Sequence, residues 1–359
     1  MPIPAQRDPE LTSRQLEAWL ARRMPGATDL AVSGIAPPSF TGFSSDTLLF
    51  DLAWREDGVA RRRGLVARIR PSGYTVFPEY DLPQQYRIVR ALAERSDVPV
   101  PDALWLEPDE DVLGAPFFVM AKVDGRIPGD NPTYHTAGWV TEVAPAERAA
   151  MWWHGLEVLA RIHRLDWRTL GLDVLATHIP GPPGVDRQIA YYERFLAWAA
   201  RGRPQPTAEA ALAWLRRHQP RDEPVGFCWG DARIGNMIFD AGRCVAVLDW
   251  EMATLGNPEQ DLGWWLFLDR HHSEGIGVPR LDGFPSRADT VARYEELTRR
   301  RVQHLEFYEV FAGFRFAVIM CRIAQMMIAF DVLPADSDME TNNIVTQLLA
   351  RMLNLPPPG

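Results

Sequence analysis

A polar loop and a predicted hairpin, residues 228–251, interrupt the otherwise helical second half of the sequence. The stretch CWGDARIGN leads into two short apolar runs, NMIFD and CVAVLDW, which are separated by the turn at 240–242. Apolar runs of this length between turn residues are typical of strands. The hairpin would return Asp249 to the neighbourhood of Asp231 and Asn236. The sequence therefore predicts one site that holds two carboxylates and an amide.

Oxygen ligands of this kind are suited to phosphoryl transfer. Carboxylate and amide oxygens are ligands that Mg²⁺ prefers, and Mg²⁺ commonly takes its other ligands from waters and nucleotide phosphates. Phosphoryl transfer needs such a metal together with a further carboxylate that orients the attacking hydroxyl. Each polar residue can also be interpreted as a turn former that hydrogen-bonds its own backbone. For any one residue taken alone, the turn is the better interpretation.

The predicted elements divide the chain into a strand-rich first part and a helical second part. A helix is expected from about residue 12, followed by strands at TLLFDLAWRED and RRRGLVARIR, a helix at LPQQYRIVRALAERS and further strands. Helical periodicity dominates after the turn-rich segment 126–138. A chain of 359 residues has room for two lobes with separate cores. We expect a first lobe over residues 1–120 and a second over residues 121–359.

Charge and composition argue against several classes of function. The formal net charge of -9 disfavours a nucleic-acid partner bound through a general basic surface. The N-terminus has no basic-then-apolar leader, and the three widely spaced cysteines indicate neither disulfides nor a zinc site. The most apolar run begins at Phe311 and contains Arg315 and Arg322, so a buried helix is expected there rather than a membrane span. We expect a cytoplasmic protein with no nucleic-acid or membrane partner.

Taken together, the polar motifs resemble the signature of a known family. GDARIGN, followed by VLDWEMATLGNPEQDLGWW, is similar to the motifs of the aminoglycoside phosphotransferase-like family, which is related to the protein kinases. The chain most resembles a branch of uncharacterised phosphotransferases that includes the kinase-like domains of some acyl-CoA dehydrogenases. The resemblance runs from about Val32 to the C-terminal helices. It implies an α+β, protein-kinase-like two-lobe fold, with a small β-rich first lobe of five strands and a larger helical second lobe.

The resemblance implies catalytic roles in the second lobe. Asp231 matches the catalytic Asp that receives the substrate hydroxyl. Asn236 matches the metal-binding Asn of the catalytic loop, and Asp249 matches the metal-binding Asp of the kinase D-F-G motif. Arg233 stands where protein kinases often carry a Lys that contacts the transferring phosphate, although a surface arginine is an equally good interpretation.

Three further polar residues of this lobe have more modest interpretations. Asp261 matches a family Asp that braces the catalytic loop, so we expect a structural role. Glu251 could reach the metal or only the solvent. His163 is expected to be a hydrogen-bonded histidine at a helix C-terminus and not a catalytic one. Two pairs of neighbouring indoles, Trp152–Trp153 and Trp264–Trp265, could wall a substrate pocket, with one of each pair partly exposed, but core packing is the commoner role.

The first lobe is implied to bind the nucleotide. Small residues in FTGFSSDT let backbone N–H groups approach phosphates. With the resemblance, the phosphate-loop candidates are Ser44, Ser45 and Thr47. Arg68, in LVARIRP, stands where kinases carry the phosphate-pairing Lys, and its forked, permanently charged guanidinium can replace that Lys. FFVMAKVDG resembles the hinge between the lobes, so the backbone from Met120 to Lys122 is expected to receive the adenine edge.

Two positions depart from the family pattern. The Glu that pairs with the first-lobe cation in kinases falls at Gln85, and the His of the usual H-G-D falls at Trp229. Gln85 can still accept a hydrogen bond from Arg68, and an indole can pack where kinases place a scaffold His. The nearby carboxylates that could replace the missing Glu are Glu79, Asp81 and Glu94.

These observations leave two functions open. The first is an ATP- and Mg²⁺-dependent kinase that phosphorylates a hydroxyl of a small molecule, either an aminoglycoside-like compound, whose positive charge would suit Glu251 and Asp269, or a hydroxylated metabolite. The second is a nucleotide-binding pseudokinase that has lost catalysis. The presence of Asp231, Asn236 and Asp249 together favours the enzyme. The sequence indicates neither the acceptor nor the oligomeric state.

Overall fold

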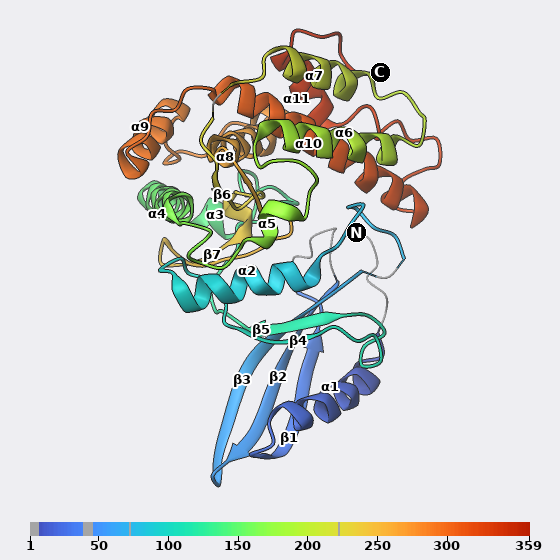
Figure 1. The fold of residues 1–359 in the computed structure, drawn as a ribbon, viewed down its shortest axis with the longest axis vertical. Helices are drawn as coiled ribbons and strands as arrows, with labels where there is room; N and C mark the ends of the chain where they lie inside the picture. Colours follow the sequence, from blue (N-terminus) through green and yellow to red (C-terminus); the bar gives the residue numbers. More distant parts are fainter. Residues whose placement is uncertain (1–6, 39–45, 72, 222) are drawn as a thin grey trace.

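The computed structural model describes residues 7–38, 46–71, 73–221 and 223–359 of the protein. The first part of the chain forms an antiparallel sheet with a helix packed on one face (Figure 1). Its strands, in the order β1-β2-β3-β5-β4, are β1 (Ala27–Ala36), β2 (Asp46–Glu56), β3 (Val59–Ile69), β4 (Ala103–Glu107) and β5 (Phe117–Ala121). The five expected strands are therefore present. The sheet ends at Ala121, and the division into lobes at residue 120 stays a prediction.

Helix α1 (Pro9–Arg23) begins three residues before the expected position. The cause is Asp8, whose carboxylate accepts the backbone N–H groups of Glu10 and Leu11 and so caps the helix. The apolar stripe of α1 covers one face of the sheet and forms a core with it. The residues that α1 buries there are Leu16, Trp19 and Leu20.

Strands β2 and β3 form the predicted hairpin. Its two turn residues, Asp57 and Gly58, have positive φ angles of 51° and 76°. Positive φ at both positions is the pattern of a type I′ turn, whose twist matches that of the paired strands. The register pairs Thr47 of β2 with Arg68 of β3. One phosphate-loop candidate and the candidate first-lobe cation therefore lie side by side at the end of the hairpin remote from the turn.

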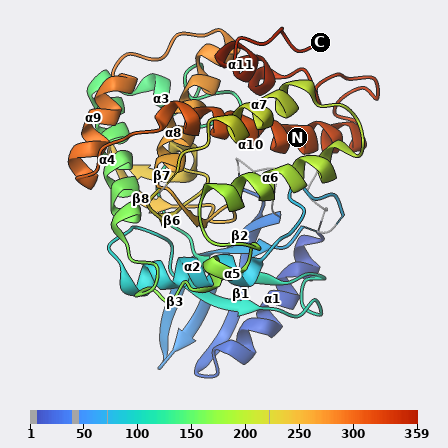
Figure 2. The ribbon, with the colours of Figure 1, turned by 45° about the horizontal axis from the view of Figure 1, so that its top comes forward.

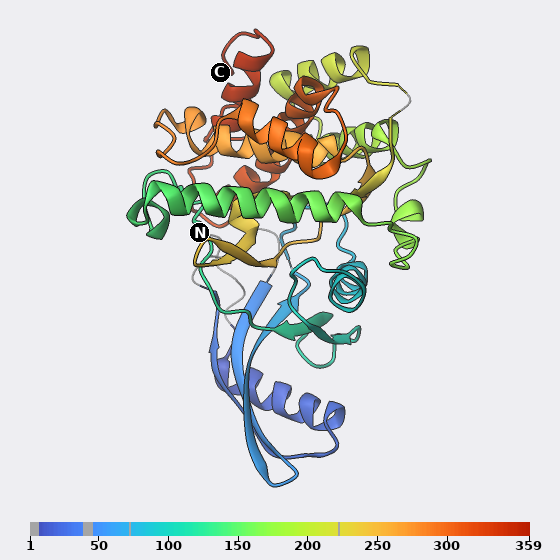
Figure 3. The same cartoon turned by 90° about the vertical axis from the view of Figure 1, so that its left-hand side faces the viewer.

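Helix α2 (Leu82–Arg95) lies between the sheet and the helical part of the chain (Figure 3). Asp81 caps it by accepting the N–H of Gln84 at 2.8 Å. One face, including Tyr86, packs on the strands, and another, including Ile88 and Leu92, joins the large helical core. Since α2 contributes to both cores, it couples the sheet mechanically to the helices.

The second part of the chain consists mainly of helices (Figure 2). The helices in chain order are α3 (Trp139–Glu142), α4 (Pro145–Arg164), α5 (Val174–Thr177), α6 (Val185–Ala200), α7 (Pro206–Arg217), α8 (Glu259–His272), α9 (Arg287–Thr298), α10 (Leu305–Ala329) and α11 (Ile344–Met352). Short 3₁₀ turns are η1 (Ile234–Asn236) and η2 (Glu274–Ile276). Two small antiparallel pairs lie among them, β6 (Gly226–Cys228) with β9 (Thr254–Gly256), and β7 (Met237–Asp240) with β8 (Arg243–Val247).

Helix α10 is the central helix of this part and packs against α6, α7, α8 and α11. Within the described part of the chain, it is the one helix long and apolar enough to span a membrane. However, 78% of its most apolar window is buried inside the protein. The interpretation of this segment as a buried helix is confirmed, because its apolar residues meet those of neighbouring helices.

Helices α8 and α10 approach each other closely at two glycines. A Cβ atom on Gly263 of α8 would lie 2.6 Å from the backbone carbonyl carbon of Tyr308 in α10. Conversely, a Cβ on Gly313 of α10 would lie 2.8 Å from the ring of Phe267 in α8. Atoms cannot approach so closely, so the spacing of the two helices depends on glycine at both positions.

We predict that Gly263→Ala destabilises the protein by about 1–3 kcal/mol, although alanine is the better helix former by about 1 kcal/mol. The added methyl meets backbone atoms, which cannot rotate away, so the helices must separate. Urea unfolding of the variant measures the free energy. Gly26→Ala is the matched control, since no atom lies within 4 Å of its added Cβ. Equal stability of the two variants would contradict the close approach.

Candidate active site

The predicted loop and hairpin bring their polar residues together. Strand β6 leads into a turn that carries Asp231, η1 ends at Asn236, and the β7–β8 hairpin returns the chain to Asp249. The amide Nδ2 of Asn236 donates to Oδ2 of Asp231 at 2.6 Å and to its backbone oxygen at 3.2 Å. These bonds use Nδ2 of the amide and fix its orientation, so the amide oxygen is the candidate ligand atom of Asn236.

Asp261, at the start of α8, holds the backbone of the loop at residues 229–236, the candidate catalytic loop. Its two carboxylate oxygens accept the N–H groups of Trp229 at 2.6 Å and Gly230 at 3.0 Å. His163 lies within 3.0 Å of the same carboxylate through Nε2 and within 2.6 Å of the Tyr294 hydroxyl through Nδ1. Asp261 is completely buried. The structure thus places Asp261 as a brace and His163 as a hydrogen-bonded core residue, as expected for both.

Trp229 connects the catalytic loop to the turn that carries Asp249. Its buried indole N–H is shared between the backbone oxygens of Leu248, at 2.9 Å, and Asp249, at 3.0 Å. Asp249 has a left-handed backbone, with φ of 58°, which is uncommon for a residue other than glycine. Trp229 is therefore a scaffold residue that fixes this strained turn through a hydrogen bond as well as through packing.

Gly230 allows the two segments to touch. Its φ is 93°, and a Cβ atom there would lie 2.0 Å from the backbone oxygen of Met252. No side chain fits in that space. The catalytic loop and the turn at 249–252 are therefore in direct backbone contact.

Asp231 is surrounded by hydrogen-bond donors. Oδ1 accepts the indole N–H of Trp264 at 2.7 Å and Nε of Arg233 at 3.2 Å, while Oδ2 accepts the amide of Asn236. Burial raises the pKa of Asp231 above its ordinary value, and the negative charge of Asp249 adds to the rise. Arg233, Asn236 and Trp264 oppose that rise without cancelling it. The carboxylate is thus held in place but made more basic than an exposed one.

Arg68 is paired with two carboxylates of the turn at 249–251. Its Nη2 lies 2.9 Å from Oδ1 of Asp249 and 3.4 Å from Oε2 of Glu251. Burial would lower the pKa of Arg68, but these two carboxylates outweigh it and the pKa is raised. Glu251, which was expected to meet a metal or the solvent, is largely buried beside the guanidinium. The acid that pairs with the first-lobe cation therefore comes from the DWE motif.

The compensating partners suggested for Arg68 on or near α2 do not fill that role. Gln85 is buried on α2, but within the described ranges no hydrogen bond joins its side chain to Arg68. Asp81 caps α2, and Glu94 forms an ion pair with Arg90 on the surface. Arg68 therefore bonds to Asp249 and Glu251 of the DWE motif instead of to Gln85. The sequence pattern of α2 could not indicate these partners.

Arg233 is bound on both sides and is not a free surface residue. It donates to Oδ1 of Asp231 and, through Nη1, to the carboxylate of Asp130 at 2.5 and 2.6 Å. The pKa of Arg233 is raised, because Asp130 and Asp231 outweigh the effect of burial. Sequence reasoning missed Asp130. Its one signal in the sequence is its position in the turn-rich segment GDNP.

The nucleotide candidates of the first part are only partly described. Ser44 and Ser45 lie outside the described residues, while Thr47 is half-buried beside Arg68. At the hinge, the backbone N–H of Ala121 donates to Asp102 at 2.9 Å and that of Lys122 donates to Gly64 at 3.0 Å. These donors are therefore occupied. The role of the Met120–Lys122 backbone in receiving an adenine edge stays a prediction.

The ligands for a metal ion are few. In the parts of the chain that the structure describes, no group of three His, Cys, Asp or Glu side chains has the geometry of a metal site. Asn236 and Asp249 offer an amide oxygen and a carboxylate oxygen beside the catalytic loop. Two protein oxygens fit Mg²⁺, which usually keeps several waters and binds nucleotide phosphates, and they do not fit a metal that needs a full protein cage.

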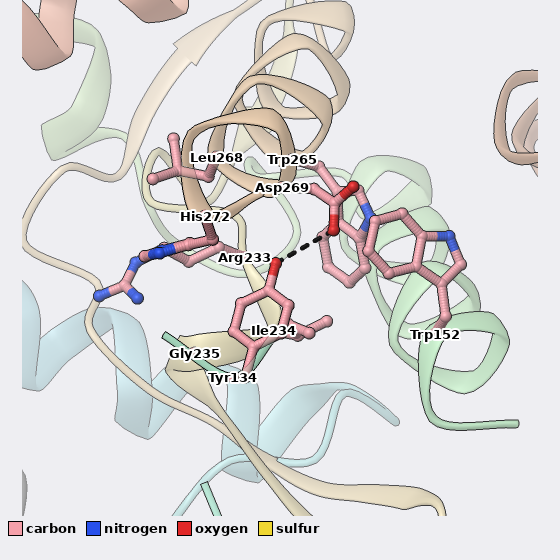
Figure 4. Close-up of a pocket in the computed structure, with 9 residues that line it drawn as sticks. All are labelled: Tyr134, Trp152, Arg233, Ile234, Gly235, Trp265, Leu268, Asp269 and His272. Atoms are coloured by element: carbon pink, nitrogen blue, oxygen red, sulfur yellow. Dashed lines mark hydrogen bonds between the residues drawn. The ribbon is translucent and has the colours of Figure 1, made fainter. Parts of the chain in front are cut away.

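A small pocket is lined by Arg233 together with residues of α4 and α8 (Figure 4). Asp269 is one of the residues that line it, and it accepts the Tyr134 hydroxyl at 3.1 Å. It also lies 3.2 Å from Nε2 of His135 and 2.6 Å from Nε of Arg280. Asp269 is therefore fully engaged, and the expectation that it would attract a cationic acceptor is not supported.

The aromatic walls of this region are buried. Trp264 and Trp265 are each 2% exposed, so the expectation that one of each pair would be partly exposed is wrong for this pair. It is confirmed for the other pair, in which Trp153 is half-buried and Trp152 is buried. Trp265 packs edge-on against Trp152 with 5.1 Å between ring centroids, and both line the pocket in Figure 4. Burial lowers the pKa of His272, on the same pocket, to about 4. That imidazole is therefore neutral near pH 7.

Comparison with known proteins gives consistent matches. A model of the phosphotransferase enzyme family matches residues 42–302. Acyl-CoA dehydrogenase family member 10 of Mus musculus is 31% identical over 273 residues, which cover 72% of this chain and 24% of that protein. The chain spans about a third or less of the length of the curated relatives that it matches first.

Solved structures show a similar fold. A candidate aminoglycoside phosphotransferase from Ralstonia eutropha JMP134 has a TM-score of 0.66 and 27% identity, covering 94% of this chain and 95% of its own. A thermostable mutant of aminoglycoside phosphotransferase APH(4)-Ia, in a ternary complex with ADP and hygromycin B, has a TM-score of 0.51 and 16% identity, covering 89% and 97%. The expected α+β, kinase-like fold is therefore confirmed.

We predict that Asp261→Asn lowers the free energy of unfolding by about 1–3 kcal/mol. The amide has one oxygen and one NH₂ group where the carboxylate had two acceptors, so one buried N–H of the catalytic loop loses its partner. Chemical denaturation measures this loss. Asp282→Asn, on an exposed carboxylate, is the control. An Asp261→Asn variant as stable as this control would mean that the loop does not depend on the brace.

Proposed function

The chain belongs to the phosphotransferase enzyme family, and on that premise we propose that it transfers the γ-phosphoryl group of ATP to a hydroxyl of a small molecule. The observation that carries the proposal is the hydrogen bond between Asp231 and Asn236 beside Asp249. It joins a half-buried carboxylate with a raised pKa to a second residue whose amide oxygen would bind the metal. The ADP bound to APH(4)-Ia, a protein of the same fold, supports a nucleotide as phosphoryl donor.

The residues would divide the work as follows. Asp231 orients the acceptor hydroxyl and accepts its proton, which the raised pKa of this carboxylate favours. Asn236 and Asp249 hold Mg²⁺, which when bound neutralises charge on the nucleotide phosphates. Arg68 exchanges its ion pair with Asp249 for the phosphates. Arg233 stays bound to Asp130 and Asp231 and contributes a fixed positive charge near the transferred group.

The charges around the site bear on the acceptor. Glu251 is paired with Arg68, Asp130 with Arg233, and Asp269 with Arg280. A polycationic aminoglycoside would have to compete with these arginines for each carboxylate. The arrangement thus favours a hydroxylated metabolite over an aminoglycoside as the acceptor.

We predict that Asp231→Asn abolishes phosphoryl transfer and leaves nucleotide binding nearly intact, because Asp231 meets the acceptor and not the nucleotide. Asp249→Ala should weaken binding of the Mg²⁺–nucleotide complex, since it removes a metal ligand. The measurements are ADP release in a screen of hydroxylated metabolites and aminoglycosides, and calorimetric binding of Mg²⁺–ADP. Asp240→Asn, on an exposed hairpin residue, is the control.

The outcomes separate the two functions. Turnover of any acceptor that is lost in Asp231→Asn supports the kinase. Equal turnover by wild type and Asp231→Asn rules out the catalytic assignment. Thermal stabilisation by Mg²⁺–ADP with no turnover across the screen favours the pseudokinase instead.

We predict a pH profile with an acid limb set by Asp231. The carboxylate must be ionised to receive the proton, and burial raises its pKa, so kcat/KM falls with decreasing pH at a higher pH than about 3.9, the ordinary value for Asp. Activity is retained above the raised pKa and lost below it. Steady-state kinetics over a pH series in which the fold is monitored by circular dichroism measures the limb. A rate independent of pH down to that ordinary value would contradict the assignment.

A further inference from the structure

Trp264 is a buried residue of α8 that contacts the candidate catalytic carboxylate directly. Its indole N–H donates to Oδ1 of Asp231 at 2.7 Å. The next residue, Trp265, is equally buried, but its indole N–H has no hydrogen-bond partner within the described part of the protein. The two adjacent indoles are therefore equally buried, but only that of Trp264 bonds to Asp231.

Arg315 of α10 holds the Trp264 indole from the other side. The centre of its guanidinium lies 4.6 Å from the Trp264 ring, and Nη2 donates to the backbone oxygen of Gly230 at 2.8 Å. Arg315 is 2% exposed, and its Nε and Nη1 have no partner in the ranges that the structure describes. A buried guanidinium with unsatisfied donors destabilises a fold. Because Arg315 contacts both the backbone of Gly230 and the indole of Trp264, we infer that it serves the site and not the stability of the fold.

The hydrogen bonds of Asp231 differ between its two oxygens. A carboxylate offers about four acceptor positions, two on each oxygen. Oδ1 accepts from Trp264 and Arg233, whereas Oδ2 accepts only from Asn236 among the described residues. The open acceptor position is therefore on Oδ2, on the side of the amide that is proposed to hold the metal.

We propose that Trp264 is a positioning residue for phosphoryl transfer, which occupies Oδ1 of Asp231 so that the acceptor hydroxyl is received at Oδ2. The proposal rests on the proposed function. As the acceptor oxygen bonds to the γ-phosphorus, its proton passes to Oδ2 and the bond from that phosphorus to the β,γ-bridging oxygen breaks, which leaves ADP. Arg315 contacts both the Trp264 indole and the Gly230 backbone, and so fixes the position of the indole relative to the loop that carries Asp231.

The kinetic test compares Trp264→Phe with Trp265→Phe. Both variants remove an indole from the same helix at the same depth, but only the first removes a hydrogen bond to Asp231. We expect kcat to fall roughly tenfold to a hundredfold in Trp264→Phe, with KM for Mg²⁺–ATP within about twofold of wild type. Trp265→Phe should keep the wild-type kcat. The assay uses the acceptor from the screen, and ATP hydrolysis with water as acceptor in parallel.

A second measurement tests the contact without turnover. In ¹⁵N-tryptophan-labelled protein, the indole proton of Trp264, assigned from Trp264→Phe, should resonate downfield because it bonds to a carboxylate. Asp231→Ala should move that resonance upfield and leave the Trp265 resonance in place. Arg315→Lys, which keeps the charge but not the planar stacking, should move it in the same direction by a smaller amount.

The results separate this inference from the proposed function. Loss of transfer in Asp231→Asn with a wild-type kcat in Trp264→Phe overturns the role of Trp264 and leaves the kinase standing. Full activity of Asp231→Asn overturns the kinase itself. If the Trp264 indole resonance does not move in Asp231→Ala, the hydrogen bond is absent and the proposal is wrong. If kcat falls equally in Trp264→Phe and Trp265→Phe, the effect is due to packing and the proposal is also wrong.

Discussion

The two backbone N–H groups that Asp261 accepts are the interaction on which the site depends. Trp229 and Gly230 turn the chain sharply after β6, and among the described residues their buried N–H groups bond to the Asp261 side chain and not to a strand or helix backbone. A single carboxylate at the start of α8 satisfies both, and His163 holds that carboxylate from the side. Because Asp261 and Trp264 lie on the same helix, the helix that orders the loop also orders the side chain of Asp231.

The local features of the fold could be predicted from the sequence. The β2–β3 hairpin follows from its Asp-Gly turn, and the β7–β8 hairpin from two apolar runs around 240–242. The burial of α10 follows from the arginines in an otherwise apolar run. The predicted start of α1 is three residues too late, because Asp8 caps the helix upstream of the capping pattern at Thr12.

The partners of the site residues could be predicted less well, because they come from distant parts of the chain. The motif indicated Asp231, Asn236 and Asp249, and the structure brings these together. It could not indicate that Arg68 pairs with the DWE motif, 181 and 183 residues away, instead of with α2. Nor could it indicate that Asp130 binds Arg233 or that Trp264 binds Asp231, since spacing along a sequence specifies contacts only within one element or hairpin.

The ion pair between Arg68 and Asp249 has a thermodynamic consequence for the proposed reaction. Each of the two charges neutralises the other in a largely buried setting. A bare metal ion would satisfy Asp249 but leave the guanidinium with only the longer contact to Glu251, at 3.4 Å. A bare nucleotide would satisfy the guanidinium but place its phosphates against an unshielded carboxylate. Only the two together replace both lost partners. In the proposed reaction, the affinities for metal and nucleotide would therefore be linked, and each ligand would raise the affinity for the other by the same factor.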